Sequence, residues 1–169
     1  MTDERAMLLD HLRSGRRHVL GALDGLDDAA LHRPVLPSGW SALGLVQHLT
    51  VDVERFWFGA VLTGEPAAIA QLDSRTDTGV WHVPADAAAA PILAAYREAA
   101  ERSDAAVAAT DLDAEPAWWP RELFGDWRLE NARDLLLHVI VETSTHAGHL
   151  DAARELIDGK TWLVLTEFD

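Results

Sequence analysis

The chain contains no cysteine and few basic residues. The absence of cysteine excludes disulfides, a zinc site built from thiolates and a catalytic thiol supplied by the protein itself. Only 14 lysines and arginines stand against 28 aspartates and glutamates, which gives a formal net charge of −14. Because nucleic-acid binders usually carry a basic patch and anionic lipid surfaces attract basic segments, we predict no nucleic acid and no membrane among the partners.

The chain also lacks long hydrophobic runs. No stretch approaches the roughly 18 apolar residues that a transmembrane helix needs, and residues 1–13 lack the basic and apolar regions of a signal peptide. We therefore predict a cytoplasmic protein. Its 169 residues suit one domain over 1–169. Lysine occurs only at Lys160, against thirteen arginines, and this bias together with abundant alanine suggests a bacterium with GC-rich DNA.

Helical periodicity runs through the sequence, and no segment alternates apolar and polar residues as a strand does. The pattern predicts an all-α protein with a short helical turn at 27–31 and four long helices at about 3–23, 41–64, 86–110 and 129–157. The segments 64–85 and 111–128 contain helix breakers and are expected to be loops. The first is long enough to return the chain to the opposite end of a bundle, so that the second and third helices run parallel.

The last predicted helix carries a polar stripe among apolar neighbours. Four side chains follow one another at intervals of four, four and three residues: His138, Glu142, His146 and His149. At about 100° per residue they fall within an arc of about 80°. The stripe therefore faces the interior, where an unpartnered carboxylate costs on the order of several kcal/mol. Arg133, Arg154, a protonated histidine or a metal ion would neutralise Glu142.

Glu142 and His146 lie one turn apart and can hold the same metal ion, so a third ligand must come from elsewhere. His48, in an otherwise apolar part of the second predicted helix, is one candidate. Three protein ligands with one open position are typical of catalytic zinc. Spacing alone leaves other pairs open, namely His138 with Glu142 or His146 with His149. It also leaves open the ordinary interpretation that these histidines are hydrogen-bonded core residues.

Two stretches and the order of the helices resemble a known family. The stretches are SGWSALGLVQHLTVDVERFWF at 38–58 and LLLHVIVETSTHAGHLDAARELIDG at 135–159, and a loop containing proline and tryptophan precedes the last of four helices. Over nearly its whole length the chain resembles the DinB-like superfamily, and within it the actinobacterial branch that includes the mycothiol-dependent enzymes. The resemblance implies a four-helix bundle with up-down-down-up topology and a long crossover between the second and third helices.

The resemblance also implies a metal site. The family takes one ligand from the middle of the second helix and two, four residues apart, from the last helix; the matching positions are His48, Glu142 and His146. Many DinB-like proteins have histidine at the second position, whereas the mycothiol-dependent maleylpyruvate isomerases have glutamate, as this chain does. A divalent metal is expected. Zinc suits two imidazoles and a carboxylate, with nickel, manganese and iron as alternatives.

Other residues of the last helix resemble the same motif. His138 and His149 are expected to line the cavity or to orient a ligand, and His149 is the candidate for moving a proton. Arg154 is expected either to contact an anionic substrate or to pair at the surface with Asp151 or Glu155.

The resemblance and the absence of cysteine together predict a metal-dependent thiol transferase or a related isomerase. The thiol would come from a low-molecular-weight cosubstrate such as mycothiol, and the second substrate would be an electrophile; a homodimer is compatible with the sequence. Two alternatives remain: a hydrolase in which the metal activates water, and a non-enzymatic bundle that binds a small ligand or a metal. Trp118 and Trp119 would form an exposed binding patch in the latter case and otherwise cap the core.

Overall fold

The computed structural model describes residues 3–73 and 79–162. Within these ranges every regular element is a helix, which confirms the predicted all-α class. The elements are α1 (Glu4–Leu23), α2 (Asp28–His32), α3 (Ala42–His48), η1 (Leu49–Leu62), α4 (Pro66–Asp73), α5 (Ala89–Ala109), α6 (Arg121–Phe124) and α7 (Ala132–Asp158). None of these helices has an apolar stretch of the length needed to cross a bilayer.

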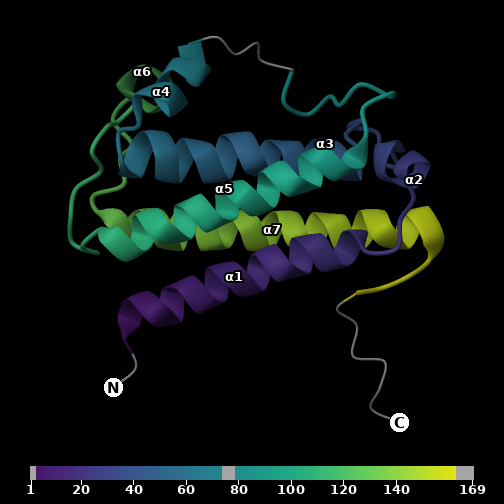
Figure 1. Cartoon of the computed structure of the whole chain (residues 1–169), viewed down its shortest axis with the longest axis horizontal. Coiled ribbons are helices and arrows are strands. Elements are labelled where there is room, and N and C mark those ends of the chain that lie inside the picture. The colour runs from purple at the N-terminus through teal and green to yellow at the C-terminus, as the bar shows by residue number, and fades with distance from the viewer. Residues whose placement is uncertain (1–2, 74–78, 163–169) are drawn as a thin grey trace.

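Four long rods form the body of the protein (Figure 1). The helices α1 and α7 run in one direction, whereas the continuous rod of α3 and η1 and the helix α5 run in the other. The chain therefore goes up, down, down and up, as the resemblance implied. The helix α7 packs against α1, and α5 packs against η1. This arrangement requires a crossover between η1 and α5, which the sequence predicted.

Capping residues fix the helix ends close to where the sequence placed them. The Asp3 side chain accepts a backbone hydrogen bond in the first turn of α1, and the Ser41 side chain accepts one from the Gly44 N–H at the start of α3. Asn131 caps α7 in the same way. Gly159 ends α7 with a φ of 77°, a left-handed conformation that glycine adopts without strain.

The second rod changes its helix type partway along. It is an α-helix up to His48 and continues through η1 for 14 residues as a π-helix, ending with a hydrogen bond from the Thr63 N–H to the Phe58 carbonyl at 3.2 Å. The predicted limits of the helix at 41–64 are confirmed, but the helix is α-helical only up to His48 and π-helical from Leu49 to Leu62. Wider π-helical turns are rare and often occur at functional sites, and His48 lies at the change.

Two segments predicted as loops contain short helices. Residues 64–85 include α4 and residues 111–128 include α6, so the prediction of irregular structure throughout both segments was wrong. Gly64 follows the end of η1, as the sequence predicted, whereas Pro66, interpreted as a loop signal, begins α4. Gly64 adopts a left-handed φ of 66°, and proline at the first helical position loses no helix hydrogen bond.

A buried set of charges joins three rods across the core. Arg16 of α1 is 5% exposed and Glu54 of η1 is 1% exposed. The Arg16 guanidinium donates through Nε and Nη2 to the two Glu54 oxygens at 2.7 and 2.6 Å, and through Nη1 to Asp104 of α5 at 2.6 Å. The ring of Phe58, which is 1% exposed, lies 5.9 Å from the Arg16 guanidinium carbon. The charges of Arg16 and Glu54 therefore compensate each other at buried positions.

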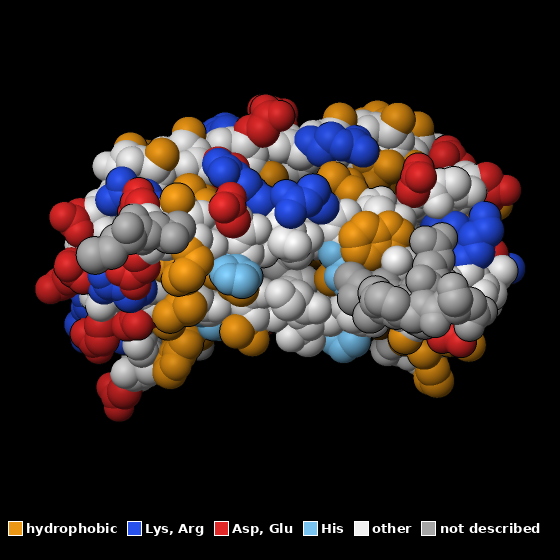
Figure 2. Space-filling view, turned by 90° about the horizontal axis from the view of Figure 1, so that it is seen from below, with side chains coloured by type: hydrophobic (Ala, Val, Ile, Leu, Met, Phe, Trp, Pro, Cys, Tyr) orange, Lys and Arg blue, Asp and Glu red, His pale blue; other side chains and the backbone are white. Residues whose placement is uncertain are grey.

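The exposed surface mixes charges of both signs. On the face that Figure 2 shows, acidic and basic side chains are interspersed, and histidines lie near its middle. Arg13 pairs with Asp104 at 2.7 Å, and Arg102 pairs with Glu65 at 2.7 Å. Pairs at such exposed positions contribute about 0–1 kcal/mol each. The buried Arg16 pair is therefore the ion pair on which stability should depend most.

We predict that Arg16→Met lowers the free energy of unfolding by about 3–5 kcal/mol, because Glu54 would then be an unpaired charge in the core. Arg13→Met removes a half-exposed partner of the same Asp104 and should cost less than about 1 kcal/mol. Urea denaturation measures both values. Replacing both charged groups, in R16M/E54L, should recover most of the loss. Equal effects of R16M and R13M would contradict this account of the core.

Candidate metal centre

Two rods bring three side chains together in the middle of the bundle. His48 stands at the end of α3, and Glu142 and His146 lie one turn apart on α7. One ligand atom from each lies within 4.8 Å of the other two. The Glu142 Oε1 atom is 3.2 Å from His146 Nε2 and 4.0 Å from His48 Nε2. The structure thus joins the three residues that the family motif implied, although 94 positions separate the first from the second.

The His48 imidazole is oriented by a carboxylate one turn further along. Its Nδ1 lies 2.8 Å from Asp52 Oδ2, whereas its Nε2 is buried without a hydrogen-bond partner and faces Glu142. A carboxylate on Nδ1 holds the proton there and leaves the Nε2 lone pair available. A buried, unpartnered nitrogen beside a carboxylate fits a metal ligand. The spacing of His48 and Asp52 was visible in the sequence, but it was not used in the prediction.

An indole ring from the crossover covers His48. The ring of Trp81 stacks on the imidazole with a centroid distance of 4.0 Å and an interplanar angle of 17°. The Gln47 amide donates to the Val80 carbonyl at 2.7 Å and fixes this part of the crossover to α3. A methyl group added at Gly44 would lie 2.3 Å from the Trp81 carbonyl oxygen, so glycine permits the close approach. The crossover thereby forms one wall of the site.

The Glu142 carboxylate is held in its ionised form. The hydrogen bond with His146, followed by the influence of the neighbouring His48 imidazole, lowers the pKa of Glu142 far below its ordinary value despite partial burial. Arg133, a sequence candidate for neutralising this charge, pairs with Glu4 and Asp113 instead. An ionised carboxylate beside two imidazole nitrogens is a donor set that suits a divalent cation.

His149, the predicted proton carrier, lies next to the three residues. Its Nδ1 is 3.4 Å from Nδ1 of His146, and its ring centroid is 6.5 Å from that of Trp40. The side chain is exposed. His149 therefore lies at the solvent-exposed side of the site. It is next to Nδ1 of His146, whereas Nε2 of His146 faces Glu142.

His138 belongs to an aromatic cluster one turn before Glu142 on α7. Its ring packs edge-on against Trp57 at 4.6 Å and lies 5.6 Å from Trp127, centroid to centroid. Burial lowers the pKa of His138, so the neutral imidazole is favoured. Trp118 and Trp119 are half-buried and pack against the core, which confirms that they cap it.

Arg154 is occupied by structural contacts. Arg154 is 5% exposed, and its guanidinium donates to two backbone carbonyls at the end of α1, those of Ala22 and Asp24. It also donates to the Asp158 carboxylate one turn further along α7. The predicted surface pair of Arg154 with Asp151 or Glu155 was wrong, because Arg154 Nε donates to Asp158 instead. These contacts tie the end of α7 to the end of α1 and give Arg154 a structural role.

The fold and the site define the class of protein. An up-down-down-up bundle with one candidate ligand on its second rod and two on its last is a DinB-like protein. A family model described as mycothiol S-transferase matches residues 7–159. The chain therefore belongs to the mycothiol S-transferase family, which confirms the predicted resemblance. No curated protein and no solved structure matches the chain in these comparisons.

We predict that the purified protein binds one divalent cation per chain and that Glu142→Ala removes most of it, because two half-buried imidazoles remain without the anionic ligand. Glu155→Ala, at an exposed position of the same helix, is the matched control and should keep full occupancy. Elemental analysis after dialysis measures the stoichiometry. Unchanged metal content in E142A would remove Glu142 from the set of ligands.

We predict that Asp52→Asn weakens metal affinity about 10–100-fold, since the amide no longer holds His48 as a carboxylate does. Asp151→Asn provides the control, because Asp151 makes an equivalent bond to His18 at 2.7 Å outside the three-residue group. Competition with a chromogenic chelator gives both dissociation constants. If D52N binds the metal as tightly as D151N does, Asp52 has no part in orienting His48.

Proposed function

We propose that the chain is a metal-dependent S-transferase that joins mycothiol, or a related low-molecular-weight thiol, to an electrophile in the cytoplasm. His48, Glu142 and His146 are the proposed ligands. The convergence of these three side chains, with ligand atoms within 4.8 Å of one another, is the observation that carries the proposal. Membership of the mycothiol S-transferase family supports the thiol as the cosubstrate.

Zinc is the metal we propose first, because two imidazoles and one carboxylate with an open position are the ligand set of several catalytic zinc sites. Nickel, manganese and iron accept the same donors. When bound, such an ion supplies Lewis acidity that lowers the pKa of a coordinating thiol and favours the thiolate near neutral pH. The protein itself has no cysteine, so the sulfur must come from the cosubstrate.

The residues around the ligands have distinct proposed tasks. Asp52 keeps the proton on Nδ1 of His48, and Trp81 holds the plane of that ring. His149 accepts the proton that the thiol loses and passes it to solvent, which its exposed position allows. His138, neutral within its aromatic cluster, lines the side of the site where an apolar electrophile would pack.

The proposed reaction is a substitution. A carbon–sulfur bond forms between the thiol sulfur and the electrophilic carbon. The bond from that carbon to the leaving group breaks, and the leaving group departs with the bonding electron pair. The thiol proton goes to His149, so no oxidant or reductant is needed.

We predict that the metal-loaded protein accelerates conjugation of mycothiol to monobromobimane above the rate without protein. E142A should abolish the acceleration together with the bound metal. H149Q should keep the metal but lose roughly a hundredfold or more in rate, the range typical of a lost proton-transfer group. Fluorescence of the conjugate measures the rate.

Glutathione and cysteine serve as comparison thiols in the same assay. A rate equal to the protein-free rate with every thiol and with several electrophiles would contradict the proposal. Hydrolysis of an ester panel in the absence of any thiol would instead indicate a hydrolase with the same metal ligands.

A further inference from the structure

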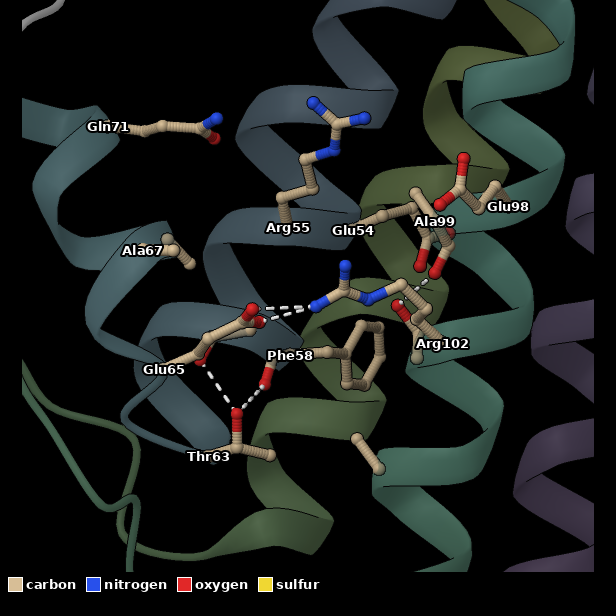
Figure 3. A pocket seen from close by; sticks show the side chains of 14 residues that line it. Glu54, Arg55, Phe58, Thr63, Glu65, Ala67, Gln71, Glu98, Ala99 and Arg102 are labelled. Atoms are coloured by element: carbon tan, nitrogen blue, oxygen red, sulfur yellow. Dashed lines mark hydrogen bonds and ion pairs between the residues drawn. The ribbon is translucent and has the colours of Figure 1, made fainter.

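A cavity of about 420 Å³ lies between η1, α4 and α5 (Figure 3). Its lining includes no residue of α3 or α7, the helices that carry His48, Glu142 and His146. The cavity is therefore separate from the candidate metal centre. Its volume falls within the roughly 300–1,000 Å³ that small-molecule sites occupy.

Small residues on three facing elements create this space: Gly59, Ala67, Ala68, Ala99, Ser103 and Ala106. Protein interiors are otherwise close-packed, and larger side chains at these positions would fill the gap. Phe58, which is 1% exposed, adds an aromatic wall. Part of the cavity wall is therefore apolar, and the carbon chain of a ligand can pack against it.

A buried carboxylate forms part of the floor. Glu54 lines the cavity although it is only 1% exposed, and each of its oxygens accepts one N–H from Arg16. A carboxylate has about four acceptor positions, so two remain for a further donor. Glu54 can therefore receive a cationic group from the cavity without losing its bonds to Arg16.

The charged groups at the edge of the cavity fall into two kinds. Glu65 and Arg102 neutralise each other through bonds of 2.7 and 2.8 Å, which Figure 3 shows as dashed lines between the two side chains. Arg55 of η1 and Glu98 of α5 make no hydrogen bond or ion pair with any other residue in the described ranges. One cation and one anion thus extend from facing helices without protein partners.

We propose that this cavity binds a small zwitterion of the amino-acid class. The carboxylate of the ligand pairs with Arg55, and its ammonium group lies between Glu98 and the free acceptor positions of Glu54. The carbon chain of the ligand packs on Phe58. A ligand with one charge would satisfy only one of the two unpaired groups, whereas a zwitterion of suitable length satisfies both.

The chain length that best joins Arg55 to Glu98 and Glu54 can be measured with ω-amino acids from glycine to 6-aminohexanoate. Each is titrated calorimetrically into the full-length protein. We expect saturable binding with one preferred chain length. Hexanoate and hexylamine, which carry one charge each, should bind at least about tenfold more weakly than the preferred zwitterion. Equal binding of hexanoate or hexylamine, or no saturable binding of any ω-amino acid, would overturn the proposal.

Substitutions locate the binding. R55M and E98Q should each weaken the preferred zwitterion at least about tenfold. R97M and E101Q change neighbouring exposed residues of α5 that do not line the cavity, and they should leave the affinity unchanged. E142A should also bind the zwitterion normally, which separates this site from the metal centre. Unaltered affinity in both R55M and E98Q would overturn the proposal, and urea denaturation checks that the variants are folded.

Discussion

The half-buried carboxylate of Glu142 is the constraint on which the candidate site depends. It lies between two imidazoles, 3.2 Å from His146 and 4.0 Å from His48. His146 is supplied by the same helix, but His48 arrives only because the rod of α3 and η1 packs along α7. The site is thus a product of tertiary packing, and the same packing sets the topology of the bundle. Glycine at position 44 allows the crossover to approach α3 closely, and the ring of Trp81 stacks on His48.

The protein handles its buried charges in two different ways. Arg16 and Glu54 form a two-point ion pair between α1 and η1, and breaking such a pair leaves one charge buried without a partner. The candidate metal centre differs from this pair, because Nε2 of His48 is buried next to an ionised carboxylate and lacks a hydrogen-bond partner. The Arg16–Glu54 pair explains cohesion between rods, whereas the unpartnered nitrogen beside Glu142 fits metal binding.

Much of the fold could be predicted from local patterns. Caps such as Ser41 and Asn131 and the helical spacing of apolar residues determine the long helices and their ends. The stripe containing Glu142 and His146 was likewise visible as a periodicity on one helix. The choice of His48 as their partner needed the family resemblance, because spacing cannot show which residues meet across a bundle. The roles of Trp81 and of Arg16 depend on contacts between distant segments. The helix α4 was missed because Pro66 was interpreted only as a loop signal, although proline is also common at the first position of a helix.

The most direct measurement of the central claim is X-ray absorption at the metal edge of the zinc-loaded protein, with and without mycothiol. We expect a first shell of nitrogen and oxygen donors with the scattering signature of two imidazoles. Addition of the thiol should introduce one sulfur at about 2.3 Å. A shell without imidazole, or one that the thiol leaves unchanged, would contradict the assignment of His48, Glu142 and His146 as a centre that activates a thiol.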